Sequence, residues 1–547
     1  MKSWILHIGF LLIASGAFSQ KIDYAWPVAT KPALVANFGE LRSNHYHMGL
    51  DMRTEQRENL RVLAAERGFV SRIKIEPWGF GRAIYIDHPN GVTSLYAHLN
   101  DFEPALEAWV TAKQYELKSW ALDLYLTPEQ FPVKRGQFIA YSGNTGGSQG
   151  PHVHFELRDT KSETVLNPLT HGFTITDNIP PDIIRLAVYD RCKSTYEQSP
   201  RIIALKRTGS VYSPATPGPI VVNTDKVSFG ITSYDKYTGS TNQNGIYSAA
   251  LFHNGAEQTR FIMDSIHYKD TRYLNAHIDY KTKLSGGPYI QHLSRLPGHV
   301  NSVYHGGDGI ISLPTTDPQQ IKIEVADPDG NKSILQFSIR SSNRLDGSTP
   351  NSNGTLFHPG MVNIFENENV RFFLSEKSLY DSFRFIYSSQ PSAAGTIHNI
   401  HKPIVPIQEF YNLFIKAPEN ADTGKTMMKK FYGTKTDFKK AEFRNGWFTA
   451  SWRDFGNFQL VTDTIPPLIS AITRTATRIS FSITDNTEEL TNFRATLNGQ
   501  WIRFSNDKGR LFVYKFDEYC NPGPNELLIE VEDYVGNRSE KRFTFTR

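Results

Sequence analysis

The sequence contains very little cysteine: Cys192 and Cys520 are the only two among 547 residues. They lie far apart in the chain, so we expect neither a disulfide framework nor a zinc site built from cysteine. Any metal ion must therefore be held by histidine and carboxylate side chains, the other protein ligands that zinc accepts.

The sequence also lacks a large net charge and long apolar runs beyond its first residues. Lys and Arg number 59 against 55 Asp and Glu, a formal net charge of +4, and the basic residues are scattered. This pattern excludes a basic surface of the kind that binds nucleic acid. A transmembrane helix needs about 20 apolar residues in a row, so no integral membrane segment is expected after the N-terminal run.

The N-terminal residues have the pattern of a signal peptide. Met1-Lys2-Ser3 is basic, Trp4 to Ala17 is apolar, and Ala17-Phe18-Ser19 places small residues before Gln20. We therefore predict that residues 1–19 are removed on export. The expected location is the periplasm or the cell envelope, or the medium outside the cell.

A short alternating segment, residues 150–158, carries two neighbouring histidines. Side chains of a strand alternate between two faces, so His152, His154 and Glu156 share one face while Val153, Phe155 and Leu157 share the other. One imidazole of such a pair can bind a metal ion while the other handles a proton. An isolated His-x-His on a solvated surface strand remains the alternative.

A second histidine is followed by a carboxylate four residues later, in His47-Met48-Gly49-Leu50-Asp51. His47 and Asp51 share a face on a strand and also on a helix, so they converge in either case. Gly49 leaves room for an ion close to the backbone. A surface His–Asp pair without a metal is the alternative.

Residues 61–99 predict a series of strands and turns, with a hairpin at Asn90-Gly91. The last strand, residues 92–99, places His98 on the face opposite its apolar side chains. His88 has the same phase as Ile84 and Ile86, which predicts a packed structural histidine.

Three of these segments, in this order, resemble the LytM/lysostaphin-type zinc metallopeptidases of the M23 peptidase family. The matching segments are "FGELRSNHYHMGLD", "GFGRAIYIDHPNGVTSLYAHL" and "VKRGQFIAYSGNTGGSQGPHVHFELRD", within residues 26–170. The resemblance implies one Zn²⁺ ion per chain with His47, Asp51 and His154 as metal ligands. It implies His98 and His152 as catalytic histidines, without deciding which is the general base.

The family chemistry is hydrolysis of a peptide bond by metal-activated water. Histidine suits proton transfer near neutral pH because its ordinary pKa is about 6.5. The glycine-rich loop 142–150 borders the cleft in the family. Glu156 and Arg158 are expected either to support the site residues or to be structural.

Residues 101–132 have no counterpart in the short connection common in the family. Glu103-Pro104 and the apolar residues that follow predict a helical insert. Because it starts directly after the His98 strand, we hypothesise that it walls the catalytic groove; an inert peripheral pair of helices is the alternative.

The rest of the chain predicts further β modules. "TDNIPPDI" at 176–183 and "TDTIPPLI" at 462–469 nearly repeat, as do the segments 323–340 and 529–547. These resemble the immunoglobulin-like β-sandwiches of exported bacterial proteins. The predicted fold is mainly β, with an antiparallel metallopeptidase domain at 20–175, sandwiches at 176–342 and 463–547, a linker at 343–354 and a β domain at 355–462. An insertion is predicted at 245–310, and its scattered histidines are expected to be solvated or structural.

Three functions follow from these predictions. The first is an exported zinc endopeptidase that cuts the peptide cross-links of peptidoglycan. The second is a non-catalytic or masked scaffold of the same family that regulates other cell-wall hydrolases. The third is a binding protein whose β modules dock to cell-envelope proteins.

Overall fold

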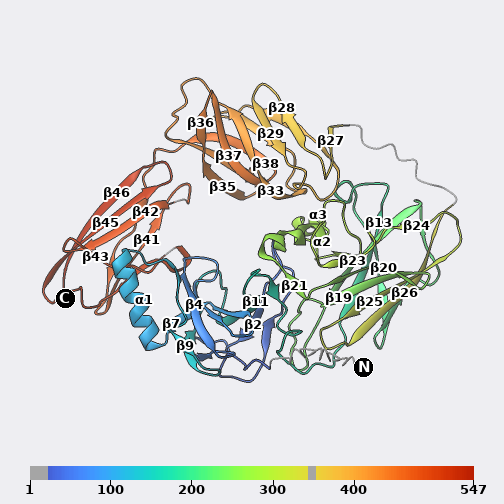
Figure 1. Cartoon of the computed structure of the whole chain (residues 1–547). Coiled ribbons are helices and arrows are strands. Elements are labelled where there is room, and N and C mark those ends of the chain that lie inside the picture. The colour runs from blue at the N-terminus through green and yellow to red at the C-terminus, as the bar shows by residue number, and fades with distance from the viewer. Residues whose placement is uncertain (1–22, 343–352, 489, 510) are drawn as a thin grey trace, which may run out of the picture.

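The computed structural model describes residues 23–342, 353–488, 490–509 and 511–547. The predicted signal peptide, residues 1–19, lies outside the described residues, as does most of the predicted linker 343–354. The fold is mainly β, as predicted, and consists of several packed β units (Figure 1). We call residues 23–175, 176–342, 353–462 and 463–547 the first, second, third and fourth modules.

The first module is built on a large antiparallel sheet with the strand order β1-β2-β11-β6-β5-β4-β8. Its apolar faces are buried in a core that includes Leu50, Val153 and Phe155, none of which is exposed to solvent. Burial of such side chains contributes about 1.5–3 kcal/mol each. The strands are β1 (Leu34–Ala36), β2 (Leu50–Arg53), β4 (Gly68–Ile75), β5 (Arg82–Asp87), β6 (Val92–Ala97), β8 (Leu122–Tyr125), β9 (Pro132–Val133), β11 (His152–Asp159) and β12 (Val165–Leu166).

A smaller three-stranded sheet packs beside it, in the order β3 (Arg61–Leu63), β10 (Phe138–Ser142) and β7 (Leu99–Phe102). The prediction of one strand over residues 92–99 is wrong, because the chain turns at His98 from β6 into β7. His98 has a φ of 60°, a left-handed conformation that is uncommon for residues other than glycine. The turn moves His98 off the regular alternation of the strand.

Only the first half of the predicted helical insert, residues 101–132, is helical. The helix α1 (Pro104–Leu117) begins with proline, whose fixed φ suits a first helical turn, and the Glu103 side chain accepts hydrogen bonds from the amides of Ala105 and Leu106. The second half is not helical: β8 pairs with β4 at the edge of the large sheet.

The second module contains two sheets, and part of the predicted insertion belongs to them. The prediction that residues 245–310 form an insertion is wrong for β19 and β20, because β19 pairs with β25 in the centre of a sheet. The first sheet holds β13 (Asp182–Asp190), β14 (Arg201–Ile203), β18 (Lys226–Tyr234), β22 (Gln291–His292) and β24 (Ile311–Ser312). The second holds β15 (Leu205–Thr208), β16 (Val211–Pro214), β17 (Ile220–Val222), β19 (Ser248–His253), β20 (Ala256–Ile262), β23 (Tyr304–Gly306), β25 (Gln319–Ala326) and β26 (Lys332–Ser341).

Residues 263–303 of the second module reach toward its neighbours. The strand β21 (Ser265–Ile266) pairs with β12 and so extends the sheet of the first module. Phe38 and Tyr46 of the first module share a core with the second. The short helices of this segment are η2 (Tyr268–Tyr273), α2 (Leu274–His277) and α3 (Tyr280–Leu284), and η1 (Thr195–Glu197) lies earlier in the module.

The third and fourth modules are also built from antiparallel sheets. The third has β27 (Thr355–Phe357), β28 (Asn363–Glu366), β29 (Val370–Leu374), β30 (Phe383–Phe385), β31 (Tyr387–Gln390), β32 (Ile397–Ile400), β33 (Pro406–Lys416), β34 (Thr426–Tyr432), β35 (Lys435–Lys440), β36 (Glu442–Arg444), β37 (Trp447–Asp454) and β38 (Gly456–Thr462). The fourth has β39 (Leu468–Ile469), β40 (Thr473–Arg474), β41 (Arg478–Thr484), β42 (Leu490–Leu497), β43 (Gln500–Trp501), η3 (Asp507–Gly509), β44 (Leu511–Lys515), β45 (Pro524–Asp533) and β46 (Arg538–Thr546).

The repeated sequence phrases make the same contacts in the second and fourth modules. Asn331 donates its side-chain amide to Asp327 and to the carbonyl of Asp177. In the fourth module Asn537 donates in the same way to Asp533 and to the carbonyl of Asp463. Each Pro-Pro linker is thus tied to the turn between the last two strands of its own module.

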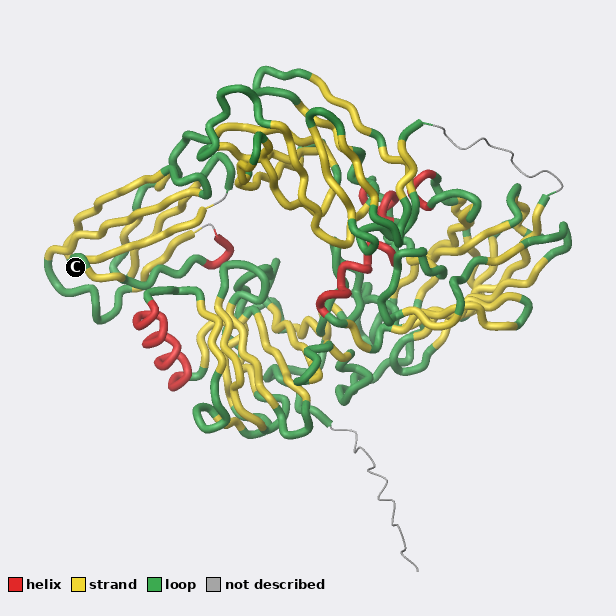
Figure 2. The backbone as a smooth tube through the Cα atoms, turned by 45° about the horizontal axis from the view of Figure 1, so that its top comes forward, coloured by secondary structure: helices red, strands yellow, loops and turns green. Residues whose placement is uncertain are grey.

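The four modules follow one another around a ring that the fourth module closes against the first (Figures 1 and 2). No helix among the described residues is long and apolar enough to span a membrane. Hydrogen bonds cross each junction: Asn37 to Gly245, Arg272 to Asp454, Lys425 to Val535, and Arg503 to Gln114 of α1.

Candidate metal centre

Two histidines and one carboxylate meet at the centre of the large sheet of the first module. Asp51 in β2 lies directly opposite His154 in β11, and partners in antiparallel register project to the same face. His47 precedes β2 and reaches the same point. The His47 Nε2 atom lies 2.9 Å from Asp51 Oδ1 and 3.1 Å from His154 Nδ1, and the last two atoms are 3.0 Å apart.

The second nitrogen of each ring is already used as a donor. His47 Nδ1 donates to the carbonyl of Asn37 at 2.7 Å, and His154 Nε2 donates to Glu156 Oε1 at 3.0 Å. These bonds orient the rings so that the remaining nitrogens face Asp51, the way in which metal-binding histidines are held. Three electron-pair donors at this distance need a cation or an additional proton between them.

The spacing suits zinc. Ligands about 2.0–2.1 Å from a tetrahedral ion lie roughly 3.3 Å from one another, slightly more than the distances seen here. The ligand atoms of His47, Asp51 and His154 all lie within 4.8 Å of one another and are buried. A set of two histidines and one carboxylate leaves a fourth position for water or substrate, as in catalytic zinc sites.

His98 and His152 lie next to this centre. Their ring centroids are 4.8 Å apart, and His152 Nε2 is 3.4 Å from Asp51 Oδ1. His98 Nδ1 donates to the carbonyl of Thr145 and His152 Nδ1 donates to the carbonyl of Gly150, each at 2.8 Å. Both rings therefore keep Nε2 for other contacts, and the structure brings together all five residues singled out in the sequence.

A family model of known proteins covers this part of the chain. Residues 45–115 and 121–168 match the model of peptidase family M23. This part of the chain is an M23 peptidase domain. We call the part of the chain from residue 45 to residue 168 the M23 domain from here on.

Relatives of known sequence match the same region. The DD-carboxypeptidase/endopeptidase Mpg of Neisseria meningitidis is 33% identical over 112 residues, 20% of this chain and 20% of the relative. A metalloprotease of Haemophilus influenzae, described as uncharacterized, is 31% identical over 124 residues, 23% of this chain and 20% of the relative. The chain therefore matches about a fifth of the length of these relatives.

Solved structures include two M23 proteins. The catalytic domain of the prophage-encoded M23 protein EnpA of Enterococcus faecalis is 20% identical, with 28% of this chain and 98% of that chain covered and a TM-score of 0.21. The catalytic domain of lysostaphin from Staphylococcus simulans is 21% identical, with 24% and 86% covered and a TM-score of 0.18.

The third module has a family match of its own. Residues 354–463 match the model of a Zu5-like domain. The sequence predicted a β domain at 355–462 without assigning it to a family. The immunoglobulin-like character of the second and fourth modules stays a prediction.

Glu156 holds the His154 ring of the M23 centre through the hydrogen bond to His154 Nε2. It is fully buried, accepts a hydrogen bond from Arg158 Nε at 2.7 Å and another from the Tyr268 hydroxyl. Burial raises the pKa of Glu156, but Arg158 and His154 outweigh it and lower the pKa to about 2. Tyr268 belongs to the second module, so the module that follows the M23 domain helps to orient His154.

Charge within the centre is strongly coupled. Burial opposes ionisation of Asp51, yet His47, His152 and His154 hold the pKa of this carboxyl well below its usual range. Burial alone would lower the pKa of His154, but Asp51 and Glu156 raise it to about 9. A histidine must be neutral to bind a metal, so metal binding displaces a proton from His154 and strengthens as the pH rises.

The pKa of His98 is shifted in the opposite direction from that of His154. Burial, followed by the nearby rings of His152 and His154, lowers the pKa of His98 to about 3. His98 is therefore neutral at neutral pH and can accept a proton. A pKa near 7 is best for proton transfer at neutral pH. His98 therefore becomes an effective base only if a change of charge at the centre raises its pKa.

Arg42 is a residue near the centre that sequence reasoning missed. Its Nη2 atom lies 3.3 Å from Asp51 Oδ2 and 3.2 Å from Glu40 Oε1. The ion pair fixes the second carboxylate oxygen of Asp51. The motif "FGELRSNHYHMGLD" contains Arg42, but a contact across nine residues of irregular chain cannot be read from its spacing.

Two predicted glycine positions are sites of close approach. A Cβ atom on Gly49 would lie 2.3 Å from the carbonyl oxygen of Phe155 and 3.0 Å from His154 Cε1, so glycine lets β11 approach, and room for an ion at this position stays a prediction. In the loop 142–150, a Cβ on Gly146 would lie 2.3 Å from the amide of Gly81. That loop packs tightly on the turn at Gly79–Gly81.

His88 and the histidines of the second module do not belong to the group of metal-ligating atoms. His88 is buried and bonded to the carbonyl of Arg67 and to Ser94, as predicted for a structural residue. His277, His292 and His299 are buried within the second module, and His305 is exposed.

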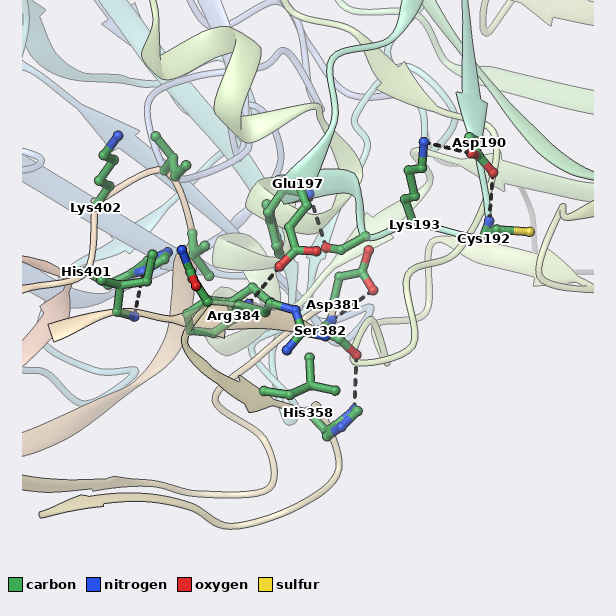
Figure 3. Close-up of a pocket in the computed structure, with 18 of the residues that line it drawn as sticks. Asp190, Cys192, Lys193, Glu197, His358, Asp381, Ser382, Arg384, His401 and Lys402 are labelled. Atoms are coloured by element: carbon green, nitrogen blue, oxygen red, sulfur yellow. Dashed lines mark hydrogen bonds and ion pairs between the residues drawn. The ribbon is translucent and has the colours of Figure 1, made fainter. Parts of the chain in front are cut away.

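A pocket of about 1310 Å³ lies between the second and third modules (Figure 3). Its wall carries charges of both signs, among them Arg384, Glu197 and Asp381. Thr195 donates from its amide and its hydroxyl to Asp381 Oδ2, so this pocket lines a junction between modules. It shares no residue with the M23 centre.

Proposed function

We propose that the protein is an exported zinc metalloendopeptidase that hydrolyses the peptide cross-links of bacterial peptidoglycan. The observation that carries the proposal is the convergence of His47, Asp51 and His154 on one point, with His98 and His152 beside it, inside an M23 domain. Zinc, when bound, supplies a Lewis acid that acidifies water and polarises the scissile carbonyl.

The residues of the chain supply the rest of the chemistry. Asp51 and the two ligand histidines hold the reacting groups at a fixed point of a rigid sheet, where positioning lowers the barrier. One of His98 and His152 accepts the proton of the attacking water, and the other donates a hydrogen bond to the developing oxyanion. The names of the relatives, a carboxypeptidase/endopeptidase and a metalloprotease, support peptide-bond hydrolysis.

Purified peptidoglycan sacculi test this function. We expect the zinc-loaded protein to clear a suspension of sacculi and to release muropeptides with cut cross-links, identified by mass spectrometry. Treatment with EDTA should abolish release, and added zinc should restore it. Failure of the zinc-loaded chain to release any muropeptide, both as wild type and as the unmasked variant described below, would overturn the proposal.

A specific observation favours a masked form of the same site. The η3 segment of the fourth module sits on the glycine-rich loop: Asp507 Oδ1 accepts from the amide of Gly146 at 2.8 Å, and Lys508 Nζ donates to the carbonyl of Ser148 at 2.8 Å. The Ser148 hydroxyl in turn lies 3.2 Å from His152 Nδ1.

The helix α1 provides the other half of this docking surface. The Tyr115 hydroxyl donates to Asp517, and its ring stacks on Tyr519 with centroids 4.2 Å apart. Arg503 donates to Thr111 and Gln114. The insert therefore binds the fourth module beside the loop, and the hypothesis that it walls the groove stays a prediction.

Removal of both η3 side chains tests the masking. In the double variant Asp507→Ala, Lys508→Ala we expect sacculi to be cleared roughly threefold to tenfold faster, because hydrogen bonds to charged groups contribute about 1.5–3 kcal/mol at most and less where exposed. Turbidity assays at equal zinc content measure the rate. The exposed Lys515→Ala is the matched control and should leave the rate unchanged; an equal or slower rate in the double variant contradicts the masking.

A further inference from the structure

A second group of buried carboxylates lies outside the M23 centre. Asp177, Asp235 and Asp327 come from three separate segments: the linker before β13, the end of β18 and the end of β25. One oxygen of each lies within 4.8 Å of the others. Asp235 is 0% exposed and Asp327 is 2% exposed.

Several oxygens of this group have no hydrogen-bond partner among the described residues. Asp177 uses Oδ1 to accept from the amide and the hydroxyl of Thr238, both at 3.0 Å, which leaves its buried Oδ2 without a donor. Both carboxylate oxygens of Asp235 are buried without a donor. Buried polar atoms in native proteins are nearly always bonded, so such a cluster calls for a ligand.

The side-chain amide oxygen of Asn244 is a further candidate ligand beside the three carboxylates. Asn244 is 1% exposed, and its Oδ1 is buried without a donor. Asn244 and Asp235 exchange both backbone hydrogen bonds across an isolated antiparallel bridge. Residues paired in this way project their side chains to one face, so the Asn244 side chain lies on the same face as the Asp235 carboxylate.

No lysine or arginine in the described part of the chain forms an ion pair with any of the three carboxylates. Lys236, the residue after Asp235, pairs with Asp182. Burial and the neighbouring carboxylates of Asp327 and Asp177 raise the pKa of Asp235 to about 8. Buried charges of one sign are costly unless a cation compensates them.

We propose that Asp177, Asp235, Asp327 and Asn244 bind a calcium ion. The donor set contains oxygen only, with several carboxylates and one amide carbonyl, which is the ligand preference of a hard cation. Calcium accepts six to eight oxygens in flexible geometry, whereas magnesium demands a near-ideal octahedron, so an irregular set from four chain segments favours calcium.

The position of the site connects it with the M23 domain. The loop 235–244 begins and ends at the Asp235–Asn244 bridge. The next residue, Gly245, exchanges two hydrogen bonds of 2.8 and 2.9 Å with the Asn37 side chain. The Asn37 carbonyl is the group that accepts from His47. Calcium therefore fixes the loop that holds Asn37, and through it the orientation of His47.

The fourth module offers a matched control. Its corresponding carboxylates are Asp463, Asp485 and Asp533. There Asn486 donates to Asp463 Oδ1 at 3.0 Å, and Thr487 donates to Asp485 Oδ2 from its amide and its hydroxyl. The other oxygens, Asp463 Oδ2 and Asp485 Oδ1, are buried without a donor, so the difference from the second module is that the three carboxylates do not converge. Within the described ranges these three do not form a group of converging ligand atoms.

Calcium titration of the full-length protein, treated with EGTA, separated from the chelator and then reloaded with zinc, tests the proposal. We expect isothermal titration calorimetry to show one calcium ion per chain and the melting temperature to rise with calcium concentration. Asp235→Asn should weaken binding at least about tenfold and abolish the rise, while Asp485→Asn should behave as wild type. Asp177→Asn provides a second variant, because its amide oxygen still accepts from Thr238.

Two results overturn the proposal. One is the absence of both binding heat and a calcium-dependent shift in the wild type. The other is unchanged calcium affinity in Asp235→Asn and Asp177→Asn. A larger shift with MgCl₂ than with CaCl₂ at equal concentration overturns the assignment to calcium. None of these readouts depends on peptidase activity.

Discussion

Replacement of Asp51 by alanine is expected to abolish both zinc binding and the release of muropeptides. Asp51 Oδ1 is the atom on which His47 and His154 converge, so its loss removes one of three ligands and the charge that orients the other two. Metal chemistry supplies several kcal/mol of transition-state stabilisation, and each 1.36 kcal/mol is a tenfold change in rate. A loss of roughly a thousandfold or more follows.

The zinc content measured by elemental analysis should fall from one ion per chain to near zero in Asp51→Ala. Asp123→Ala is the matched control, because Asp123 is a partly exposed carboxylate in β8 of the same sheet, paired with Arg72. Near-ultraviolet circular dichroism establishes that both variants are folded. An Asp51→Ala protein that keeps its zinc, or that releases muropeptides like the wild type, would refute the ligand assignment.

The parts of the site that were predicted from sequence are those set by local geometry. Strand alternation has period two, so the shared face of His152, His154 and Glu156 follows from their spacing of two, and β11 is a strand as predicted. Both of its faces are buried from Val153 to Arg158, and not the apolar face alone. The approach of His47 to Asp51 does not follow from this period, because His47 precedes β2. The sequence therefore predicted which side chains share a face within one strand.

Contacts between distant segments were not predictable. Tyr268 reaches Glu156 across 112 residues, and Asn37 is held by Gly245 across 208. Pairing of this kind depends on how modules pack, which no local period encodes. The prediction of an insertion over 245–310 was wrong in part for the same reason, because the pairing of β19 with β25 joins residues about 70 positions apart in sequence.

The turn at His98 shows where local reasoning misled. Alternation over residues 92–99 favoured one continuous strand, yet the chain takes a left-handed conformation at His98 and enters a second sheet. Strained backbone is often retained at functional positions. Here the turn brings the His98 ring to 4.8 Å from His152.

Replacement of His98 by asparagine is expected to reduce muropeptide release by about 10²–10⁴-fold while zinc remains bound, since general acid–base catalysis contributes about that much. Asparagine tolerates the left-handed conformation at this position better than alanine, and its amide can still donate to the carbonyl of Thr145. The loss then reports the missing imidazole and not a disturbed turn. His152→Gln should have an effect of similar size, and the exposed His305→Ala should have none.

The pH dependence of the two variants then assigns their roles. The variant that lacks the general base should lose the acid limb of the rate profile, because that limb reports protonation of the base, whereas loss of the hydrogen-bond donor lowers the rate at every pH. The pKa of His98, lowered to about 3 by burial and the neighbouring rings, places its protonation far below neutrality. An acid limb that survives in His98→Asn and disappears in His152→Gln would make His152 the base. The reverse result would make His98 the base and require that negative charge brought by the bound substrate raise its pKa, because a cation lowers the pKa of a nearby histidine. Zinc loss in either variant would place that histidine among the ligands instead.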